Sequence, residues 1–347
     1  MFGTTQEAGT RTAGRAALRR AAMYAIASTV TAGVFLSVAA LAPAAQAATA
    51  NATASSAAKA TARIQALLDS PVNGTVNLPR GTFTVRPGLV LHQGERIVGH
   101  HTTLRVASGS GSYYAVLAGA DPTTGLSRLT ITGVTFDQNA AGNPIRNAAK
   151  LLQGKPRFVL LVSCGTSIKI TNDKFIGSDN LNTIVTGGAT HNVTISRNVF
   201  KDSNAKLHDH STIYTSGTST VISNNTFIGR TMLEAAAIEV HGDKVNVTGN
   251  HVRGYYKAAN IVASDTTFKG NHVSAAADPV DLWSVAPTAL RNVAVTGNVL
   301  NRNLAHWARV LRNLGESLPA ARFTRQVTKD ANSTQPFHRI TIHGNRG

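Results

Sequence analysis

Hydrophobic and polar residues alternate in short runs along most of the chain. In residues 236–250, the apolar side chains of Ile238 and Val240 alternate with the polar side chains of Glu239 and His241. A Gly-Asp turn follows, and a second alternating run comes after it. Alternation with a period of two is typical of half-buried β-strands. The stretch therefore predicts two short strands joined by a tight turn.

The same pattern recurs before and after this stretch, and each copy ends at an asparagine. The spacings between these asparagines are 26, 27, 25, 21 and 27 residues. Such a length suits one turn of a β-solenoid, whereas a helical repeat would need longer runs with a 3.6-residue period. We expect the asparagine side chains to stack as an internal ladder at a sharp bend, with the residues tolerating a left-handed backbone. The predicted ladder consists of Asn172, Asn198, Asn225, Asn250, Asn271 and Asn298.

The first 47 residues have the features of an export signal. Four arginines precede an apolar run at residues 21–41, and the sequence Ala-Gln-Ala at 45–47 fits a cleavage site. The run is long enough to cross a bilayer, so an uncleaved anchor is the alternative. We predict a signal peptide at residues 1–47 and a secreted, extracellular protein.

The chain is strongly basic, with a formal net charge of +17. Removing residues 1–47 leaves 30 basic and 16 acidic residues, a net charge of +14. For an exported protein this charge favours an acidic polysaccharide partner, with general solubility as the alternative. We expect no nucleic-acid partner, no stable membrane association after signal cleavage, and a monomer. Cys164 is the only cysteine, which excludes an intramolecular disulfide; we expect it to be buried filler.

Both ends of the predicted solenoid have candidate caps. Residues 48–61 are rich in Ala, Thr and Ser and are predicted to form a flexible leader. A short amphipathic helix at residues 62–70 places Ile64, Leu67 and Leu68 on one side, where they can cover the open first coil. The solenoid domain is predicted to span residues 62–347.

Two segments interrupt the repeat. Residues 138–157 form a basic insertion, which is either an anion-binding loop or a solvated one. Residues 304–336 are predicted to be a capping insertion that contains a helix at 304–313. The chain then returns to the alternating pattern at 339–345, which predicts a last strand and bend.

The opening coils resemble a known family. The helix with Ile64 and Gln65, the sequence Val-Asn-Leu-Pro-Arg-Gly-Thr-Phe at 76–83 and Ile-Val-Gly at 97–99 are similar to the pectate-lyase-like superfamily of right-handed parallel β-helices. The resemblance extends over about residues 62–302. It implies an all-β, single-stranded right-handed parallel β-helix, and an activity of the polysaccharide lyase or glycoside hydrolase type.

Candidate catalytic residues gather on two neighbouring coils. A 25-residue offset places Tyr214 beside Glu239 and Ser216 beside His241 on the outer face. Carboxylates, imidazoles and a phenol supply the acids and bases of sugar-polymer cleavage, although outward polar residues are often only solvated. The predicted catalytic residues are His241, Glu239, Tyr214, Asp209, His210 and Glu234.

Aromatic and basic residues near this cluster are candidates for the walls of a polysaccharide groove, or for packing in coil turns. The predicted substrate-binding residues are Tyr255, Tyr256, Lys257, Arg253, Trp283, Lys206 and Arg230. No cofactor is predicted. A divalent cation at His208, Asp209 and His210 has little support, since three neighbouring loop residues are a weak ligand set.

Several functions are compatible with these residues. The leading hypothesis is a lyase that cleaves a uronate-containing polysaccharide by β-elimination, with His241 or Tyr214 as base and His210 as acid. The resemblance to chondroitinase-B-like and alginate lyases favours His241, but no arginine partner follows on the next coil. The alternatives are a glycoside hydrolase that uses two of Asp209, Glu234 and Glu239, and a non-catalytic binder of glycans or other polyanions. An epimerase or a phage-like function is the residual interpretation. The catalytic motifs of polygalacturonases and the calcium site of pectate lyases are missing.

Overall fold

The computed structural model describes residues 47–111, 115–119, 125–144, 157–178, 182–203, 210–230, 235–284, 290–312, 327–329 and 337–347. The chain divides into two compact units, Met1–Asn51 and Ala52–Gly347, and every strand belongs to the second. Except for Ala47, the predicted export signal lies outside the described residues. None of the helices in the described ranges is long and apolar enough to span a membrane.

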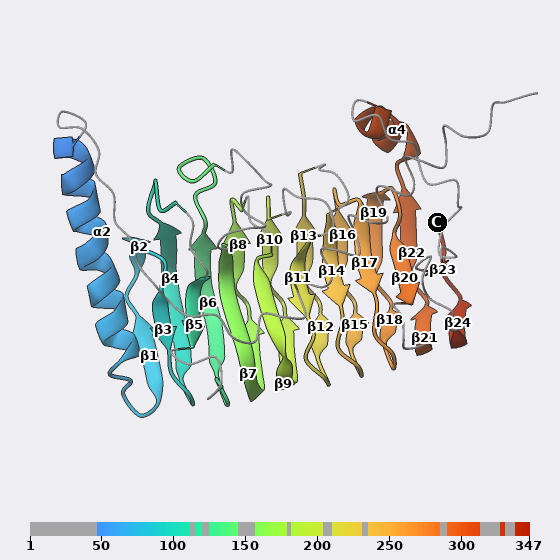
Figure 1. Ribbon diagram of the computed structural model, residues 1–347, viewed down its shortest axis with the longest axis horizontal. Coiled ribbons are helices and arrows are strands. Elements are labelled where there is room, and N and C mark those ends of the chain that lie inside the picture. The colour runs from blue at the N-terminus through green and yellow to red at the C-terminus, as the bar shows by residue number, and fades with distance from the viewer. Residues whose placement is uncertain are drawn as a thin grey trace, which may run out of the picture. The chain divides into compact units, whose positions relative to one another are not determined.

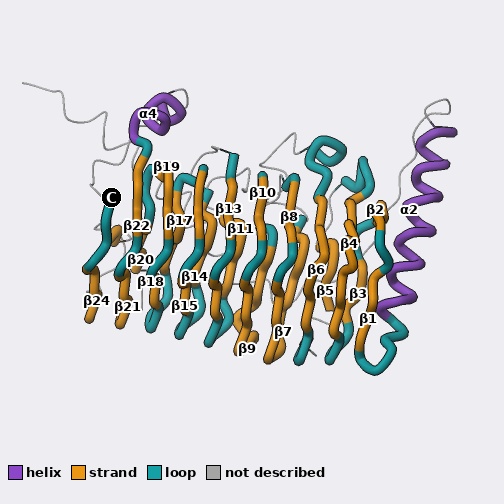
Figure 2. The backbone as a smooth tube through the Cα atoms, turned by 180° about the vertical axis from the view of Figure 1, so that it is seen from behind, coloured by secondary structure: helices purple, strands orange, loops and turns teal. Residues whose placement is uncertain are grey.

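The second unit is a right-handed parallel β-helix, as the sequence predicts. Its strands pair in parallel from coil to coil and form three faces (Figures 1 and 2). Face A consists of β3 (Leu89–Leu91), β5 (Ala115–Gly119), β7 (Phe158–Thr171), β9 (Ile184–Ser196), β11 (Ser211–Thr215), β14 (Ala236–Val240), β17 (Lys257–Ile261), β20 (Val280–Ser284) and β23 (Val327–Lys329).

Four long strands bend from one face into the next, so they contribute to two faces each. Face B consists of β1 (Thr75–Leu78), β4 (Arg96–Val106), β6 (Thr130–Asp137), β7, β9, β12 (Val221–Ser223), β15 (Asn246–Thr248), β18 (Thr267–Lys269), β21 (Arg291–Thr296) and β24 (His338–His343). Face C consists of β2 (Gly81–Val85), β4, β6, β8 (Lys174–Ile176), β10 (Val199–Lys201), β13 (Thr226–Ile228), β16 (His251–Arg253), β19 (His272–Ala276) and β22 (Val299–Arg302).

The interior is filled by apolar side chains that stack from coil to coil. Phe136, Phe175, Phe200 and Phe227 occupy equivalent positions on face C, and their successive ring centroids are 5.0, 4.9 and 4.7 Å apart. This distance matches the spacing of neighbouring strands, about 4.8 Å. Identical side chains one coil apart can therefore stack without distorting the pairing.

The asparagine ladder forms as predicted, with two corrections: its first member differs, and the left-handed backbone belongs to the residue before each ladder position. Along the ladder each Nδ2 donates to the Oδ1 of the next asparagine, at 2.7–3.1 Å. Its members are Asn198, Asn225, Asn250, Asn271, Asn298 and Asn345. The prediction for Asn172 is wrong, because Asp173 takes this place and accepts from the N–H of Val134. The residue before each ladder position, such as Asn172 (φ 58°) or Gly249 (φ 64°), adopts the left-handed backbone.

The N-terminal helix covers the open first coil, as predicted. The side chains of Ile64 and Leu68 are buried in the core, and Leu67 packs against it. The side chain of Gln65 also bonds the edge of the sheet, since its Oε1 accepts from the N–H of Val90 and its Nε2 donates to the carbonyl of Val90. The helix thus satisfies both apolar and polar groups of an edge strand.

The start of that helix corrects the predicted flexible leader. Helix α2 spans Ala47–Leu68, so residues 48–61 are helical. Alanine has the highest intrinsic helix propensity, and seven of the residues 48–61 are alanine. The prediction of flexibility from composition gave this propensity too little weight. Cys164 is half-buried and forms no disulfide, so it is less enclosed than predicted.

The C-terminal segment contains the predicted helix and last strand. Helix α4 spans Leu304–Arg312, and its Trp307 and Leu311 are buried. The indole N–H of Trp307 donates to the carbonyl of Ala275, which joins the helix to β19. Strand β24 extends face B, and Asn345 completes the ladder.

Candidate functional site

Face A carries a row of polar residues on its outer side. The strand register places Tyr214, Glu239, Asn260 and Asp281 side by side on β11, β14, β17 and β20. Strand alternation directs their neighbours Ile213 and Ile238 into the core, where both are fully buried. The predicted pairing of Tyr214 with Glu239 is confirmed. We call these four residues the face A row.

Glu239 and His241 form a sheltered pair beside the row. The Nε2 of His241 lies 2.8 Å from the Oε1 of Glu239, and their side chains are only 14% and 5% exposed. The imidazole stacks on the ring of Tyr214, with centroids 4.8 Å apart. A carboxylate that contacts an imidazole fixes the orientation of its ring. The sequence places His241 beside Ser216, but its ring contact in the structure is with Tyr214.

Tyr214 is a poor candidate for a phenolate base. Burial raises its pKa above the ordinary value of a phenol, and the nearby charge of Glu239 raises it further. A phenol with a raised pKa stays protonated at neutral pH. Its hydroxyl is therefore suited to donating a hydrogen bond, and the geometry favours His241 over Tyr214 as a base.

Two aspartates that sequence reasoning missed lie at the other end of the row. The Oδ2 of Asp281 accepts a hydrogen bond of 2.6 Å from the Nζ of Lys257. Burial raises the pKa of Asp278 to about 7, and the charge of Asp281 adds to the increase, while Lys257 and Arg302 oppose it. Environments that push the pKa values of two neighbouring carboxyl groups apart are typical of acid–base sites. Extending the coil offset from Glu239 through Asn260 would have located Asp281.

Asn260 lies between the two charged groups and has an unusual environment. Its side chain is buried, and its Oδ1 has no hydrogen-bond partner within the described part of the chain. A buried polar atom without a partner costs about 1–3 kcal/mol, and such atoms recur at functional sites. The centre of the row thus keeps a free acceptor.

A small apolar platform extends the row toward the N-terminus. Val185 and Leu161 continue the register beyond Tyr214, on β9 and β7. They pack with Ala115, Ala118 and Phe158 in a cluster separate from the main core. Three members of this cluster are buried, and only Ala118 and Val185 are partly exposed next to the polar row.

The structure corrects two of the predicted substrate-binding residues. Tyr255 is completely buried in the core, where its hydroxyl lies 2.8 Å from the Oγ1 of Thr212 and its ring meets Phe227 edge-on. Tyr256 is buried against Trp307 of α4, edge-on at 5.3 Å. The prediction that these tyrosines line a groove is wrong, because their rings fill the coil corner and the helix contact. The sequence alone could not distinguish an aromatic side chain that lines a binding groove from one that packs in the core.

The other predicted residues occupy three locations. Lys257 and Trp283 lie on face A. Lys257 forms an ion pair with Asp281, and Trp283 comes two residues after Asp281 on β20. Arg253 lies on face C. Arg230 contacts the Oδ1 of Asp202, 3.4 Å from its Nε. His210 immediately precedes β11, and its carbonyl accepts from the N–H of Ala236.

Several predicted residues cannot be placed. Asp209, Glu234 and Lys206 lie outside the described residues, as does His208 of the weak metal set. Within the described ranges, no group of three or more His, Cys, Asp or Glu side chains has an arrangement that could hold a metal ion.

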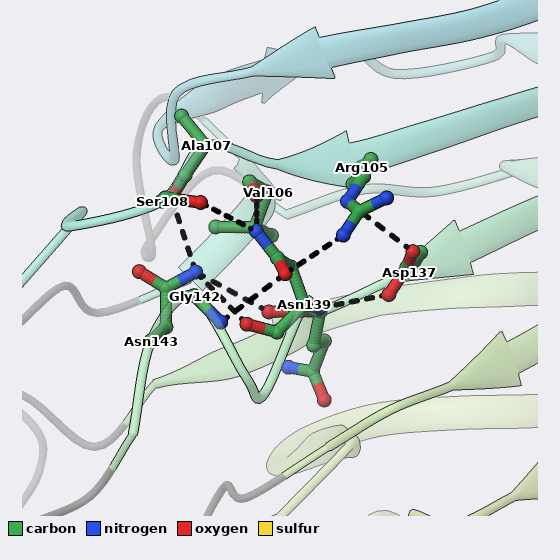
Figure 3. Close-up of polar contacts among 9 residues, drawn as sticks. Arg105, Val106, Ala107, Ser108, Asp137, Asn139, Gly142 and Asn143 are labelled. Atoms are coloured by element: carbon green, nitrogen blue, oxygen red, sulfur yellow. Dashed lines mark hydrogen bonds and ion pairs between the residues drawn. The ribbon is translucent and has the colours of Figure 1, made fainter. Parts of the chain in front are cut away.

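The base of the predicted basic insertion is held by hydrogen bonds (Figure 3). Asn139 accepts from the Nη2 of Arg105 and donates to the carbonyl of Val106. Arg157, at the other end of the insertion, donates to the carbonyl of Asn143 at 2.7 Å and is buried. Arg157 therefore has a structural role here, while residues 145–156 lie outside the described part.

Comparisons with known proteins identify the fold. No protein-family model matches the chain, and no curated protein matches it. Solved structures of the tailspike protein of E. coli bacteriophage HK620 do match. A double mutant in complex with a pentasaccharide has 16% sequence identity and a TM-score of 0.60, over 82% of this chain and 52% of the tailspike chain. A single mutant of the same protein in complex with a pentasaccharide has 17% sequence identity and a TM-score of 0.60, with the same coverage of both chains.

These matches are similarities of fold. The chain spans about half the length of the tailspike chains it matches. At this identity the likeness supports the parallel β-helix and carries no activity with it. The fold class is thus established, and the chemistry rests on the residues of this chain.

Proposed function

We propose that this protein is a glycan-binding β-helix that hydrolyses a glycosidic bond at the face A row. The observation that carries the proposal is the register of Glu239 and Asp281, two strands apart on face A, with Asp278 in the bend just before β20. Two strand spacings of about 4.8 Å put the positions of Glu239 and Asp281 roughly 9.6 Å apart, close to the upper end of the roughly 6.5–9.5 Å that separates the carboxyl groups of inverting glycosidases. The structural similarity to an oligosaccharide-binding tailspike supports a glycan ligand.

Each group has a distinct role in the proposed reaction. Asp278, with its pKa raised to about 7, is the acid that protonates the glycosidic oxygen. Glu239, oriented by His241, is the base that removes a proton from the attacking water. Asp281 forms an ion pair with Lys257, and the charge of Asp281 contributes to the raised pKa of Asp278. Trp283 and the apolar platform would contact sugar faces.

Cleavage of a uronate-containing polymer by β-elimination is the second candidate. It is favoured by the imidazole of His241 at the edge of the row and by the net charge of +17. Membership of the pectate-lyase-like superfamily, secretion from a cleaved signal and a monomeric state also stay proposals from the sequence. A phenolate of Tyr214 has less support as the base, because its pKa is raised.

The test measures two products in parallel. Purified protein is incubated with uronate-containing and neutral polysaccharides while reducing ends and unsaturated-uronate absorbance are followed. We expect reducing ends without unsaturated product, and activity that falls as pH rises through about 7, because Asp278 must be protonated. Asp278→Asn and Glu239→Gln should each lower the rate roughly 10²–10⁴-fold.

The exposed Asp265, in a turn before β18, provides the control. Asp265→Asn removes the same charge away from face A and should leave the rate unchanged. Unsaturated product that rises with reducing ends would replace hydrolysis by elimination. Binding without any product, or full activity in both variants, would refute the proposed reaction.

A further inference from the structure

Face C carries exposed basic residues in two outward columns. Lys201 and Arg253 belong to one outward column of β10, β13 and β16, with Ile228 between them. His251 and His272 belong to the adjacent outward column. Lys174 of β8 belongs to that second column too, with Val199 and Thr226 between it and His251. We call Lys174, Lys201, His251, Arg253 and His272 the face C patch.

No described residue neutralises the three permanent charges of the face C patch. In the described part of the chain, the side chains of Lys174, Lys201 and Arg253 make no ion pair or hydrogen bond, and all three residues are exposed. Asp202, which follows Lys201, contacts Arg230 instead. Asp137, at the start of the Lys201 column, contacts Arg105 with 3.6 Å between Nε and Oδ2. The patch therefore offers cationic charge to an external ligand.

A shallow depression lies at the end of this patch that contains Arg253, His251 and His272. Its volume is ≈ 290 Å³, and outward side chains of β13, β16 and β19 line it. They include the hydroxyls of Thr226 and Ser274 beside Arg253. The rings of His251 and His272 stack along one side with centroids 5.7 Å apart. Hydroxyl, imidazole and guanidinium groups in one depression can bond both the hydroxyls and the anionic groups of a sugar.

We propose that the face C patch binds an anionic polysaccharide chain at a site separate from the face A row. Because Lys201 and Arg253 lie two strands apart, roughly 9.6 Å along the helix axis, the chain would run along this axis, with one anionic group near Arg253 and another near Lys201. Single-stranded nucleic acid is a poorer fit, because it is held by aromatic rings on which bases stack. The described outward side chains of β10, β13, β16 and β19 include no Phe, Tyr or Trp.

Such a site would keep the protein on a charged polymer independently of cleavage. Linking two binding sites on one molecule raises the effective concentration of substrate at the second site. The face C patch would therefore act as an anchor, and it needs no catalytic activity on face A to do so.

The test uses a Glu239→Gln background, so that cleavage cannot consume the probe. Binding of an oligogalacturonate probe is measured by calorimetry at low and high salt. Lys201→Gln combined with Arg253→Gln should weaken binding about tenfold and reduce its salt dependence. Lys169→Gln combined with Lys269→Gln is the matched control, because these exposed lysines carry the same charge on face B.

Three further probes decide the ligand class. A sulfated oligosaccharide that shows the same loss would identify sulfate as an equivalent anionic group, and neutral dextran should not bind. Equal losses in the face B and face C variants, or no loss in either, would overturn the proposal. Tighter patch-dependent binding of a single-stranded DNA oligomer would also overturn it. Hydrolysis of short oligosaccharides by Lys201→Gln/Arg253→Gln in the wild-type background is measured separately, so a failed anchor is distinguishable from a failed active site.

Discussion

Two columns of residues run along this β-helix, and they differ in every respect except their spacing. The asparagine ladder repeats one residue from Asn198 to Asn345, and each amide bonds the next one inside the core. The face A row has a different residue on each strand, and its charged members find partners beside the row. Glu239 pairs with His241, and Asp281 pairs with Lys257.

The difference shows what repetition does in a solenoid. A repeated side chain satisfies the same hydrogen bonds at every coil, so it contributes stability and no chemistry. A column that changes from coil to coil brings unlike groups to a spacing of about 4.8 Å, where their pKa values can diverge. Variation within a column, and not polarity alone, therefore distinguishes the candidate site from the scaffold.

The largest expected effect on stability comes from breaking the ladder. The Nδ2 of Asn250 donates to the carbonyl of Ile222 and to Asn271, while its Oδ1 accepts from Asn225. Asn250→Ala should lower the free energy of unfolding by about 4 kcal/mol, because several buried groups lose partners. Urea denaturation measures the change. Asn246→Ala, at an exposed position of face B, should change it by less than about 0.5 kcal/mol.

Asp173 occupies the first position of the ladder, so a carboxyl group there can be compared with the amides of the other positions. Burial raises the pKa of Asp173 to about 8, opposed by backbone N–H groups of Val134 and Thr171. Because the folded pKa lies above the unfolded value, the folded state is destabilised as pH rises from about 4 to about 8. Asp173→Asn removes this ionisation. Its advantage over the wild type should grow from little at pH 5 to roughly 3 kcal/mol at pH 9 in denaturation experiments.

An equal benefit of Asp173→Asn at both pH values would contradict the raised pKa. The same denaturation series on Asp265→Asn, at an exposed turn, provides the baseline for removing a carboxylate from the surface.

The smallest expected effect on stability tests whether Tyr255 belongs to the core or to a binding groove. Tyr255→Phe removes a hydroxyl that contacts Thr212, whose own Oγ1 still bonds the carbonyl of Ser203. The free energy of unfolding should fall by about 1 kcal/mol with no change in KM. Trp283→Ala, on face A, should raise KM instead. A raised KM for Tyr255→Phe with unchanged stability would return Tyr255 to the binding surface.

Much of the scaffold was predictable because it depends on periodic, local signals. Period-two alternation located the strands, and the asparagine spacing located the coils. The ladder prediction failed only at Asn172, where the chain offers two adjacent polar residues and the sequence cannot tell which one faces inward. The leader at residues 48–61 failed because composition was weighed above helix propensity.

The sequence predicted only the part of the candidate site that a single offset between neighbouring coils brings together. The pairing of Tyr214 and Glu239 followed from an offset of 25 residues, while reaching Asp281 needed two further coils whose offset is 21. The lateral contact of His241 with Glu239 and the burial that raises the pKa of Asp278 have no sequence signature. They depend on how strand ends and neighbouring coils meet.

The sequence by itself determined the β-helix, its N-terminal cap and most of its stacking asparagines, because hydrophobic alternation and turn chemistry act over a few residues. Only the tertiary structure decided which polar residues are scaffold, which are sheltered acids and which stay exposed. That outcome depends on desolvation and on partners from other coils. A tyrosine such as Tyr255 looks the same in the sequence whether it enters the core or faces solvent, and the packing of the coils makes the choice.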